Sequence, residues 1–308
     1  MIDASPSRTA ALSRLREADL DALLLIRHFE LRVLDLVVSG EVGGTTHVCL
    51  GQEYVPVALS PLLDTRDMVF SNHRGHGHYL ARYQEPGSLL AEIMGRTGAV
   101  CGGVGGSQHV YRDGFLATGV QGESLPAAVG VGLDLRRRGS GGIAAVYVGD
   151  GTWGEGAVYE ALNMAQLWQV PLLVVVENNG IAQSTPTRRH LAGSVADRAR
   201  AFGIPHLLLE SDDINDIRSY LAEPIGALRR TPRPLVVEFM TVRLGPHSKG
   251  DDTRDTETLD RLRARDWYRR YAAAFPEQFA VADRRARLRI DEVVREVRSR
   301  ALAPGSAR

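Results

Sequence analysis

Apolar residues recur at helical spacing through much of the N-terminal half of the chain. Between Ser13 and Ser39 they follow a period of 3.6 residues, and Gly40 comes next as a helix stop signal. This stretch predicts one long amphipathic helix. The other elements predicted in this half are helices at 51–63 and 88–96, a short strand at 67–71 and a glycine-rich loop at 98–106.

From Ile143 to Met240 the pattern changes to short apolar runs that alternate with amphipathic helices. Strands this apolar are buried on both faces, and strands that alternate with helices form parallel sheets with right-handed crossovers. We therefore predict an α/β fold with a doubly wound parallel sheet. Its strands are expected at 143–148, 171–177, 206–210 and 234–240, and its helices at 156–168, 195–202 and 214–230.

The tail from Thr256 onward is rich in arginine, but acidic residues are mixed in at helical spacing. This charge pattern favours solvated helices or a subunit-contact arm over a nucleic-acid-binding face. We expect an α/β domain with an N-terminal helix over 1–255, followed by a C-terminal helical arm over 256–308.

Composition narrows the class of protein. The 308 residues are 44% hydrophobic, and 37 basic residues balance 37 acidic ones, so net charge does not favour a nucleic-acid or membrane partner. Cys49 and Cys101 are too few for a disulfide framework and suit a reducing compartment. The N-terminus lacks a signal-peptide pattern, and no apolar run approaches the roughly 20 residues that span a bilayer. We expect a cytoplasmic protein.

Polar side chains follow two neighbouring strands of the predicted sheet. Asp150 stands between two glycines after one strand. Asn178 and Asn179 follow the next strand, and Asn179 comes 29 residues after Asp150. Ligands bind beyond the carboxyl ends of parallel strands, and a single crossover brings these ends together. Carboxylate and amide oxygens suit Mg²⁺, which shares its oxygen shell between protein and phosphate groups.

The same stretch, GDGTWG, also matches the dinucleotide pattern G-x-G-x-x-G through Gly149, Gly151 and Gly154. A lone match is weak. Asp150 would place a negative charge beside a pyrophosphate unless a cation lay between them. The asparagines at the next strand end therefore favour a metal-bound diphosphate over a nicotinamide dinucleotide.

GDG followed by NN at this distance resembles the thiamine diphosphate signature. The resemblance extends over nearly the whole chain, through LLLIRHFELRVLDLVVSGEVGG, HVCLGQEYVPVAL, SNHRGHGHYLARY, GRTGAVCGGVGGSQHV and EALNMAQLWQVPLLVVVENN. In this order these segments resemble the alpha subunit of the decarboxylating component of 2-oxo acid dehydrogenase complexes, the pyruvate, branched-chain and acetoin dehydrogenase family. The resemblance implies the thiamine-diphosphate-binding fold, with this chain supplying its diphosphate-binding half.

Residue by residue, the resemblance implies a cofactor site. Asp150, Asn179 and the backbone carbonyl of Ile181 match metal ligands. Tyrosine usually precedes the matching arginine, where this chain has His73, and an aliphatic residue is usual near the position of Gln121. The implied cofactor contacts are His73, Arg74, Gly151, Thr152 and His247 for the diphosphate region and Gly119 and Gln121 for the aminopyrimidine and thiazolium rings.

Histidines are the implied catalytic residues. His247, in GPHSKGDD, matches an active-site histidine of a mobile loop, and His47 and His76 match histidines near the family's active centre. By spacing alone His73, His76 and His78 resemble a metal cluster, but a hydrogen-bonded loop is the better interpretation, and the resemblance removes zinc from consideration. Ser248 matches a serine that kinases phosphorylate in some relatives, although a loop hydrogen bond is favoured here. The roles of the loop glycines stay open.

The implied enzyme decarboxylates a 2-oxo acid with thiamine diphosphate and Mg²⁺. In the two-chain family the glutamate that assists the cofactor comes from the beta subunit, so we expect a heterotetramer of two alpha and two beta chains. A lipoyl-bearing acyltransferase is an additional candidate partner. The alternatives are a transketolase-like or acyloin-forming ligase, a nicotinamide dehydrogenase and a non-catalytic regulatory subunit; the joint presence of Asp150, Asn179, Arg74 and His247 argues against the last.

Overall fold

The structure, a computed structural model, describes residues 11–248, 250 and 252–306, and its chain divides into two compact units. Unit 1 is formed mainly by Ala58–Asn72 and Gly114–Val242. Unit 2 consists of Leu12–Val57, His73–Asp113 and the described residues from Arg243 onward. The chain crosses between the units repeatedly, so residues adjacent in sequence, such as Asn72 and His73, belong to different units.

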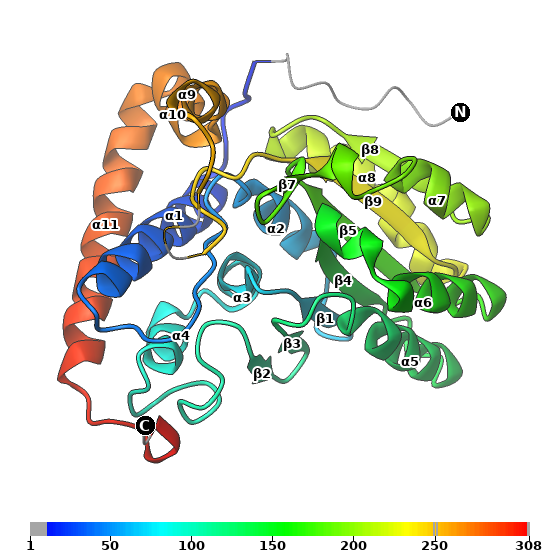
Figure 1. The fold of residues 1–308 in the computed structure, drawn as a ribbon, viewed down its shortest axis with the longest axis horizontal. Coiled ribbons are helices and arrows are strands. Elements are labelled where there is room, and N and C mark those ends of the chain that lie inside the picture. The colour runs from blue at the N-terminus through cyan, green and yellow to red at the C-terminus, as the bar shows by residue number, and fades with distance from the viewer. Residues whose placement is uncertain (1–10, 249, 251, 307–308) are drawn as a thin grey trace. The chain divides into compact units, whose positions relative to one another are not determined.

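Unit 1 is built on a parallel sheet, as its apolar strands predict. The strands run in the order β3-β1-β4-β5-β9-β8, so the chain winds outward in both directions from its centre (Figure 1). The predicted doubly wound α/β class is confirmed. The pattern missed β3, which is only three residues long. The strands are β1 (Met68–Ser71), β3 (Phe115–Ala117), β4 (Ala144–Gly149), β5 (Leu172–Asn178), β8 (His206–Leu209) and β9 (Leu235–Met240).

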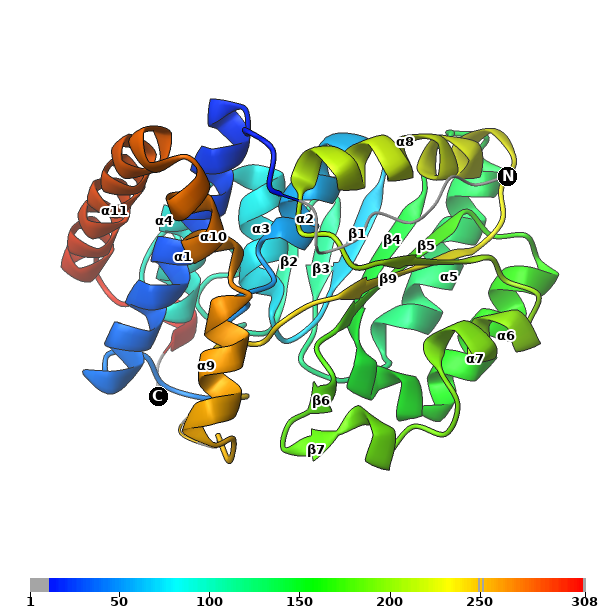
Figure 2. The ribbon, with the colours of Figure 1, turned by 90° about the horizontal axis from the view of Figure 1, so that it is seen from above.

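Helices cover both faces of this sheet, which is why its strands are apolar throughout. Figure 2 shows α8 (Ile214–Arg230) on one face and α5 (Ser124–Arg137), α6 (Gly156–Leu167) and α7 (Val195–Ala201) on the other. The core beneath the second face joins alternate residues of β4 and β5 to these helices. Helix α5 approaches closely at Gly132, where a Cβ atom would lie 2.5 Å from Val170 Cγ1.

Short elements follow the carboxyl ends of the central strands in unit 1. The 3₁₀ helix η2 (Asp150–Gly154) follows β4, and the antiparallel pair β6 (Ile181–Ala182) and β7 (Thr185–Pro186) follows β5. Another 3₁₀ turn, η3 (Thr187–Arg189), comes next. These elements lie at the edge of the sheet where the candidate ligands were predicted.

Unit 2 is mainly helical. Helix α1 packs against α3 and α11, and Figure 1 shows α11 alongside α1. No helix in the described part of the chain is long and apolar enough to cross a membrane. The elements are α1 (Glu17–Val38), α3 (Gly75–Tyr83), α4 (Pro86–Ile93), the short strand β2 (Val110–Arg112), α9 (Thr256–Ala264), α10 (Trp267–Ala274), α11 (Pro276–Ser299) and η4 (Pro304–Ser306); α2 (Tyr54–Leu59) and η1 (Ser60–Leu62) cover the passage into unit 1.

The C-terminal helices are tied to α1 by buried charge. Arg27 of α1 donates to Glu53 at 2.6 Å and makes two 2.8 Å bonds to Asp266, which also caps α10 by accepting the N–H of Tyr268. This cap separates α9 from α10. The tail therefore belongs to unit 2, and its role in subunit contact stays a prediction.

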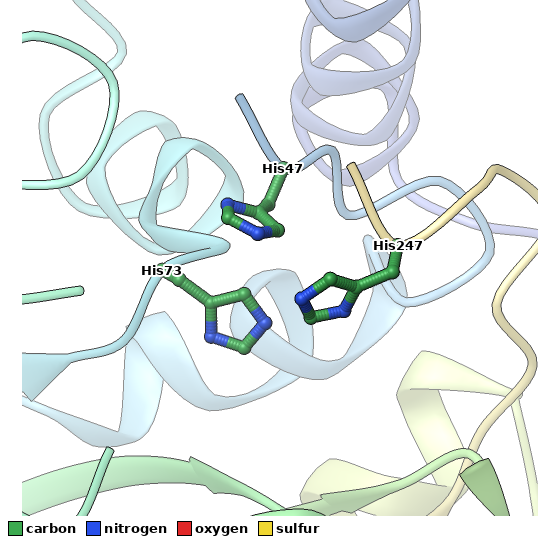
Figure 3. Close-up of side chains that lie close together, drawn as sticks. All are labelled: His47, His73 and His247. Carbon is green, nitrogen blue, oxygen red and sulfur yellow. The ribbon is translucent and has the colours of Figure 1, made fainter. Parts of the chain in front are cut away.

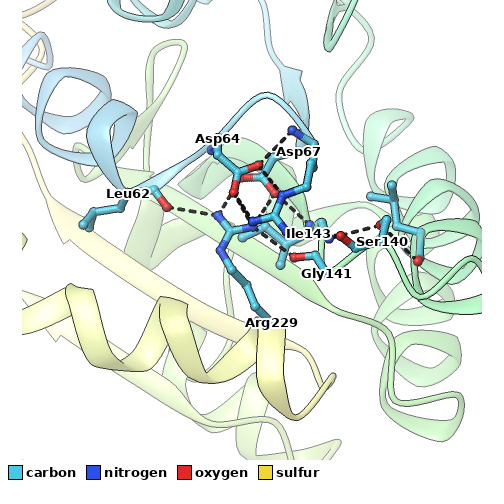
Figure 4. A network of polar contacts seen from close by, with 10 residues as sticks. Leu62, Asp64, Asp67, Ser140, Gly141, Ile143 and Arg229 are labelled. Atoms are coloured by element: carbon cyan, nitrogen blue, oxygen red, sulfur yellow. Dashed lines mark hydrogen bonds and ion pairs between the residues drawn. The ribbon is translucent and has the colours of Figure 1, made fainter.

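At the amino-terminal ends of strands β1 and β4 in unit 1, one arginine contacts three segments of the chain. Arg229, from the last turn of α8, donates two hydrogen bonds to the buried carboxylate of Asp67 at 2.6 and 2.7 Å (Figure 4). It also donates to the carbonyl oxygens of Leu62 and Gly141, while Asp67 accepts the N–H of Ile143. This network holds the amino-terminal ends of the strands, whereas the candidate ligands lie at the carboxyl ends.

Replacing Arg229 with methionine should destabilise the protein by about 3 kcal/mol, because Asp67 would keep a buried charge without its partner. Urea unfolding of the full chain measures the change. Arg230→Met is the matched control, since its ion pair with Glu223 is exposed and contributes little. Equal stability of the two variants would contradict the role given to Arg229.

Candidate functional site

Parallel pairing of β4 with β5 brings the two predicted ligand positions together in unit 1. Gly149 is in register with Glu177, so Asp150 and Asn179 both follow the paired strand ends. The backbone N–H of Asn179 lies 3.4 Å from Asp150 Oδ1. The geometry therefore places an aspartate carboxylate and an asparagine side chain at one edge of the sheet.

The Asp150 carboxylate is buried, and burial raises its pKa above the ordinary value despite hydrogen bonds that act in the opposite direction. The hydroxyl of Thr187 donates to Asp150 Oδ2. Thr187 was missed by sequence reasoning, because only the folding back of β6 and β7 carries it to the end of β4. A buried carboxylate whose charge is disfavoured is suited to pairing with a cation.

The two asparagines that follow β5 have different surroundings. Asn178 donates to Glu238 Oε1 at 2.7 Å and accepts the N–H of Gly180, so its side chain serves the turn and the next strand. Asn179 Oδ1 accepts the N–H of Ile181 at 3.2 Å and keeps capacity for a second partner. Of the pair, Asn179 is the residue placed beside Asp150.

The glycine after Asp150 has a packing reason of its own. A Cβ atom at Gly151 would lie 2.8 Å from the Cβ of Ala182 in β6, so a larger residue would push this turn away from β6. Next to it, the buried Thr152 donates its hydroxyl to Gln121 Oε1 at 2.7 Å, and Gln121 Nε2 donates to the carbonyl of Gly119 at 3.3 Å. Gly119, Gln121 and Thr152 thus form one hydrogen-bonded group.

In unit 2 the structure gathers three of the predicted histidines from distant segments. His47, His73 and His247 have ring centroids 4.6, 4.7 and 5.5 Å apart, and Figure 3 shows the rings surrounding a common space. Burial, followed by the charge of Arg74, holds the pKa of His73 well below its usual value. His73 therefore stays uncharged at neutral pH.

Arg74 lies against this histidine group. Its Nη1 donates to the Val48 carbonyl at 2.6 Å, and its Nη2 lies 3.3 Å from His247 Nδ1. Because a guanidinium can only donate, Nδ1 is the acceptor and the neutral ring carries its proton on Nε2. Within GPHSKGDD, which carried the prediction for His247, Lys249 and Asp251 lie outside the described residues.

His76 lies apart from the three-histidine group. Its Nδ1 is 2.9 Å from Glu30 Oε2, and its Nε2 is 3.0 Å from the Ser107 hydroxyl. Glu30 also accepts the N–H of Cys49 at 2.8 Å, so this buried acid holds the segment that carries His47. The histidines of HRGHGH are thus divided among different surroundings. A catalytic role for His76 stays a prediction.

Another buried acid shapes the glycine-rich loop of unit 2. Glu92 of α4 accepts the backbone N–H groups of Cys101, Gly103 and Gly105 at 2.6, 3.1 and 2.7 Å. A Cβ atom at Gly105 would lie only 1.7 Å from the carbonyl oxygen of His109, which explains that glycine. Sequence reasoning missed Glu30 and Glu92, although an acid within an apolar helical run is the signal that could have found them.

Comparisons with known proteins agree on one family. The family model described as "Dehydrogenase E1 component" matches residues 21–301. The alpha subunit of the pyruvate dehydrogenase E1 component of Zymomonas mobilis is 36% identical over 237 residues, covering 75% of this chain and 67% of that protein. Its counterpart in Rhizobium meliloti is 33% identical, covering 81% and 74%. The alpha subunit of acetoin:2,6-dichlorophenolindophenol oxidoreductase from Cupriavidus necator is 34% identical, covering 88% and 83%.

Replacing Glu92 with glutamine should loosen the glycine-rich loop, because one acceptor oxygen becomes an NH₂ group facing backbone donors. Hydrogen exchange of a peptide that spans 98–106 should become faster. Glu85→Gln, which alters an exposed ion pair with Arg112, is the control and should leave that peptide unchanged. Unchanged exchange in the Glu92 variant would show that the carboxylate does not hold the loop.

Asp150→Asn should stabilise the chain at neutral pH when divalent cations are absent. The raised pKa means that the charged carboxylate destabilises the folded state. This destabilisation is complete at pH values above the folded pKa, and it disappears as the pH falls below 3.8, the ordinary pKa of an aspartate. Thermal unfolding at a series of pH values measures this. The variant's advantage should shrink on acidification, and an advantage that grew instead would reverse the assigned sign.

Proposed function

The chain belongs to the dehydrogenase E1 component family, and from this premise we propose that it binds thiamine diphosphate through Mg²⁺ and acts with a separate beta subunit. The family is one of thiamine-diphosphate-dependent enzymes, and the chain is a 2-oxo acid dehydrogenase alpha subunit. This membership also favours thiamine diphosphate over a dinucleotide at GDGTWG. The observation that carries the proposal is the buried Asp150 carboxylate beside Asn179.

The residues at this edge of the sheet fit a magnesium ion. Asp150 offers a carboxylate, Asn179 an amide oxygen and Ile181 a backbone carbonyl, all hard oxygen donors of the kind that Mg²⁺ prefers. A cation would offset the unfavourable burial of the Asp150 charge. The turn at Gly180, with φ of 78°, lets the chain reverse so that Ile181 follows Asn179 at the same edge.

In the proposal the remaining unit 1 residues orient the cofactor. Gly151 permits close packing of the turn, and Thr152 is held by Gln121, so both stay in defined positions beside Asp150. Gly119 and Gln121 are assigned to the aminopyrimidine and thiazolium rings on the family resemblance. Thiamine diphosphate, when bound, supplies a ring that accepts the electron pair released on decarboxylation.

The unit 2 residues are assigned separately. Arg74 supplies a positive charge and its N–H groups to phosphate oxygens. Because Arg74 holds His247 in the tautomer with Nε2–H, His247 is poised to donate a hydrogen bond from that atom. His47 and His73 lie against His247, and the lowered pKa of His73 keeps it uncharged, so its contribution is a hydrogen bond and not a proton transferred near neutral pH.

The proposed assembly follows from the family. The matched relatives are named as alpha subunits, which supports a beta partner that supplies the glutamate assisting the cofactor. We extend the proposal to a heterotetramer of two alpha and two beta chains, with a lipoyl-bearing acyltransferase as the acceptor for the dehydrogenase reaction. The proposed location is the cytoplasm, where Cys49 and Cys101, both free thiols, would remain reduced.

A second candidate is acyloin chemistry. The chain matches acetoin oxidoreductase alpha subunits of two organisms at 34% identity. Gln121 places an amide, bonded to Thr152, where relatives usually have an aliphatic residue. Such a polar group suits a substrate or acceptor with an additional hydroxyl. Rates with lipoamide, aldehydes and acetoin would separate oxidative transfer from carbon–carbon ligation.

Co-expression with the beta subunit of the same organism tests the proposal directly. The complex should decarboxylate 2-oxo acids and retain thiamine diphosphate with Mg²⁺ through gel filtration, and the alpha chain alone should be inactive. Asp150→Ala should abolish cofactor retention because the metal loses its carboxylate ligand.

Asp134→Ala is the matched control, since that exposed acid pairs only with Arg138 on the surface of α5 among the contacts described. It should leave retention and activity unchanged. Normal retention of cofactor and Mg²⁺ by the Asp150 variant would refute the proposed metal site, and full activity of the alpha chain alone would refute the need for a beta subunit.

A further inference from the structure

The three-histidine group of unit 2 has a property that its proposed cofactor role does not require. One ring nitrogen from each of His47, His73 and His247 lies within 4.8 Å of the others. Figure 3 shows one nitrogen of each ring facing the space between them. The residues come from three segments, before α2, before α3 and before α9, so the group exists only in the folded chain.

We propose that His47, His73 and His247 form a binding site for a transition-metal dication of the Zn²⁺ class, separate from the oxygen site proposed for Mg²⁺. The donor set supports this choice, because imidazole nitrogens suit Zn²⁺, Cu²⁺, Co²⁺ and Ni²⁺, whereas Mg²⁺ prefers oxygen. Three histidines around zinc also leave a fourth position for water or another ligand.

The distances allow the site to close with small side-chain movements. Zinc bonds to imidazole nitrogen of about 2.0–2.1 Å require the three nitrogens to lie roughly 3.3 Å from one another in a tetrahedral arrangement. The nitrogens are at most 4.8 Å apart, so each ring would move by less than the difference between 4.8 Å and this distance of about 3.3 Å. Two of the rings are only partly buried, which leaves room for such movement.

Arg74 lies beside the group, and its Nη2 is 3.3 Å from Nδ1 of His247. Figure 3 shows the other ring nitrogen of His247, Nε2, facing the space between the rings. A metal bound there would move the ring proton to Nδ1 and displace the contact with Arg74, which at 3.3 Å is longer than most hydrogen bonds.

Arg74 also opposes the metal, and this gives the proposal a distinctive signature. Its guanidinium remains attached to the Val48 carbonyl and repels a dication at the histidines. Removing this charge should therefore strengthen metal binding. Damage to the local fold would have the opposite effect, since it would separate the three ligands.

The functional consequence rests on the proposed function, which assigns Arg74 and His247 to the cofactor diphosphate. A metal on these histidines would occupy the region that they serve, so Zn²⁺ should inhibit the enzyme. His73 supplies one of the three imidazole donors of the group. A tyrosine there would remove one of the three imidazole donors.

Cobalt supplies the binding test, because its visible absorption reports tetrahedral nitrogen coordination. Titrating the cofactor-free full chain with Co²⁺ should give this absorption. His73→Tyr and His247→Gln should each weaken binding by about tenfold or more, since even an outer-shell partner of a metal ligand is worth that much. Arg74→Gln should strengthen it several-fold, and His109→Gln, at an exposed position outside the group, should leave it unchanged.

Inhibition supplies the second test. Zn²⁺ should inhibit the alpha–beta complex reversibly, and His73→Tyr should resist it when its rate is compared with its own rate without zinc. Co²⁺ binding that is equally tight in the two histidine variants, or that weakens in Arg74→Gln, would overturn the metal site. Loss of thiamine-dependent activity in every complex would instead refute the proposed function, while the Co²⁺ titration would still decide the metal site.

Discussion

Parallel pairing of β4 with β5 is the constraint on which the candidate site of unit 1 depends. The pairing carries Asp150 and Asn179 to the same edge, although 29 residues separate them along the chain. Burial makes the Asp150 charge unfavourable, which is why we propose a cation at this edge. At the opposite edge the buried pair of Arg229 and Asp67 holds the strand beginnings. In unit 1 the stabilising ion pair and the candidate ligands therefore lie at opposite ends of the parallel strands.

Unit 2 organises its polar groups through buried acids. Glu30 holds both His76 and the backbone near His47, and Glu92 gathers the amides of the glycine-rich loop. Each carboxylate is satisfied by hydrogen bonds, as a buried charge must be. These contacts leave His47, His73 and His247 as a separate group beside Arg74. The same three rings can therefore donate hydrogen bonds to an anion or, with suitable tautomers, bind a metal.

Sequence patterns predicted the central sheet well because apolar strands and intervening helices have strong periodicities. Strands β4, β5, β8 and β9 lie close to their predicted ranges. The pattern missed β3 and α3, since a three-residue strand and a helix that begins GHGH carry little periodic signal. It gave no boundary between α9 and α10, because the cap at Asp266 depends on a side chain bonding to the backbone.

The sequence by itself determined the α/β class, the pairing of GDG with NN and the family to which the chain belongs, because these depend on local spacing. Only the tertiary structure decided which polar groups meet. It brought Thr187 to Asp150, separated His76 from His73, and placed His47 and His247 beside His73. Such contacts join residues from distant segments, and their positions follow from packing, which no local pattern records.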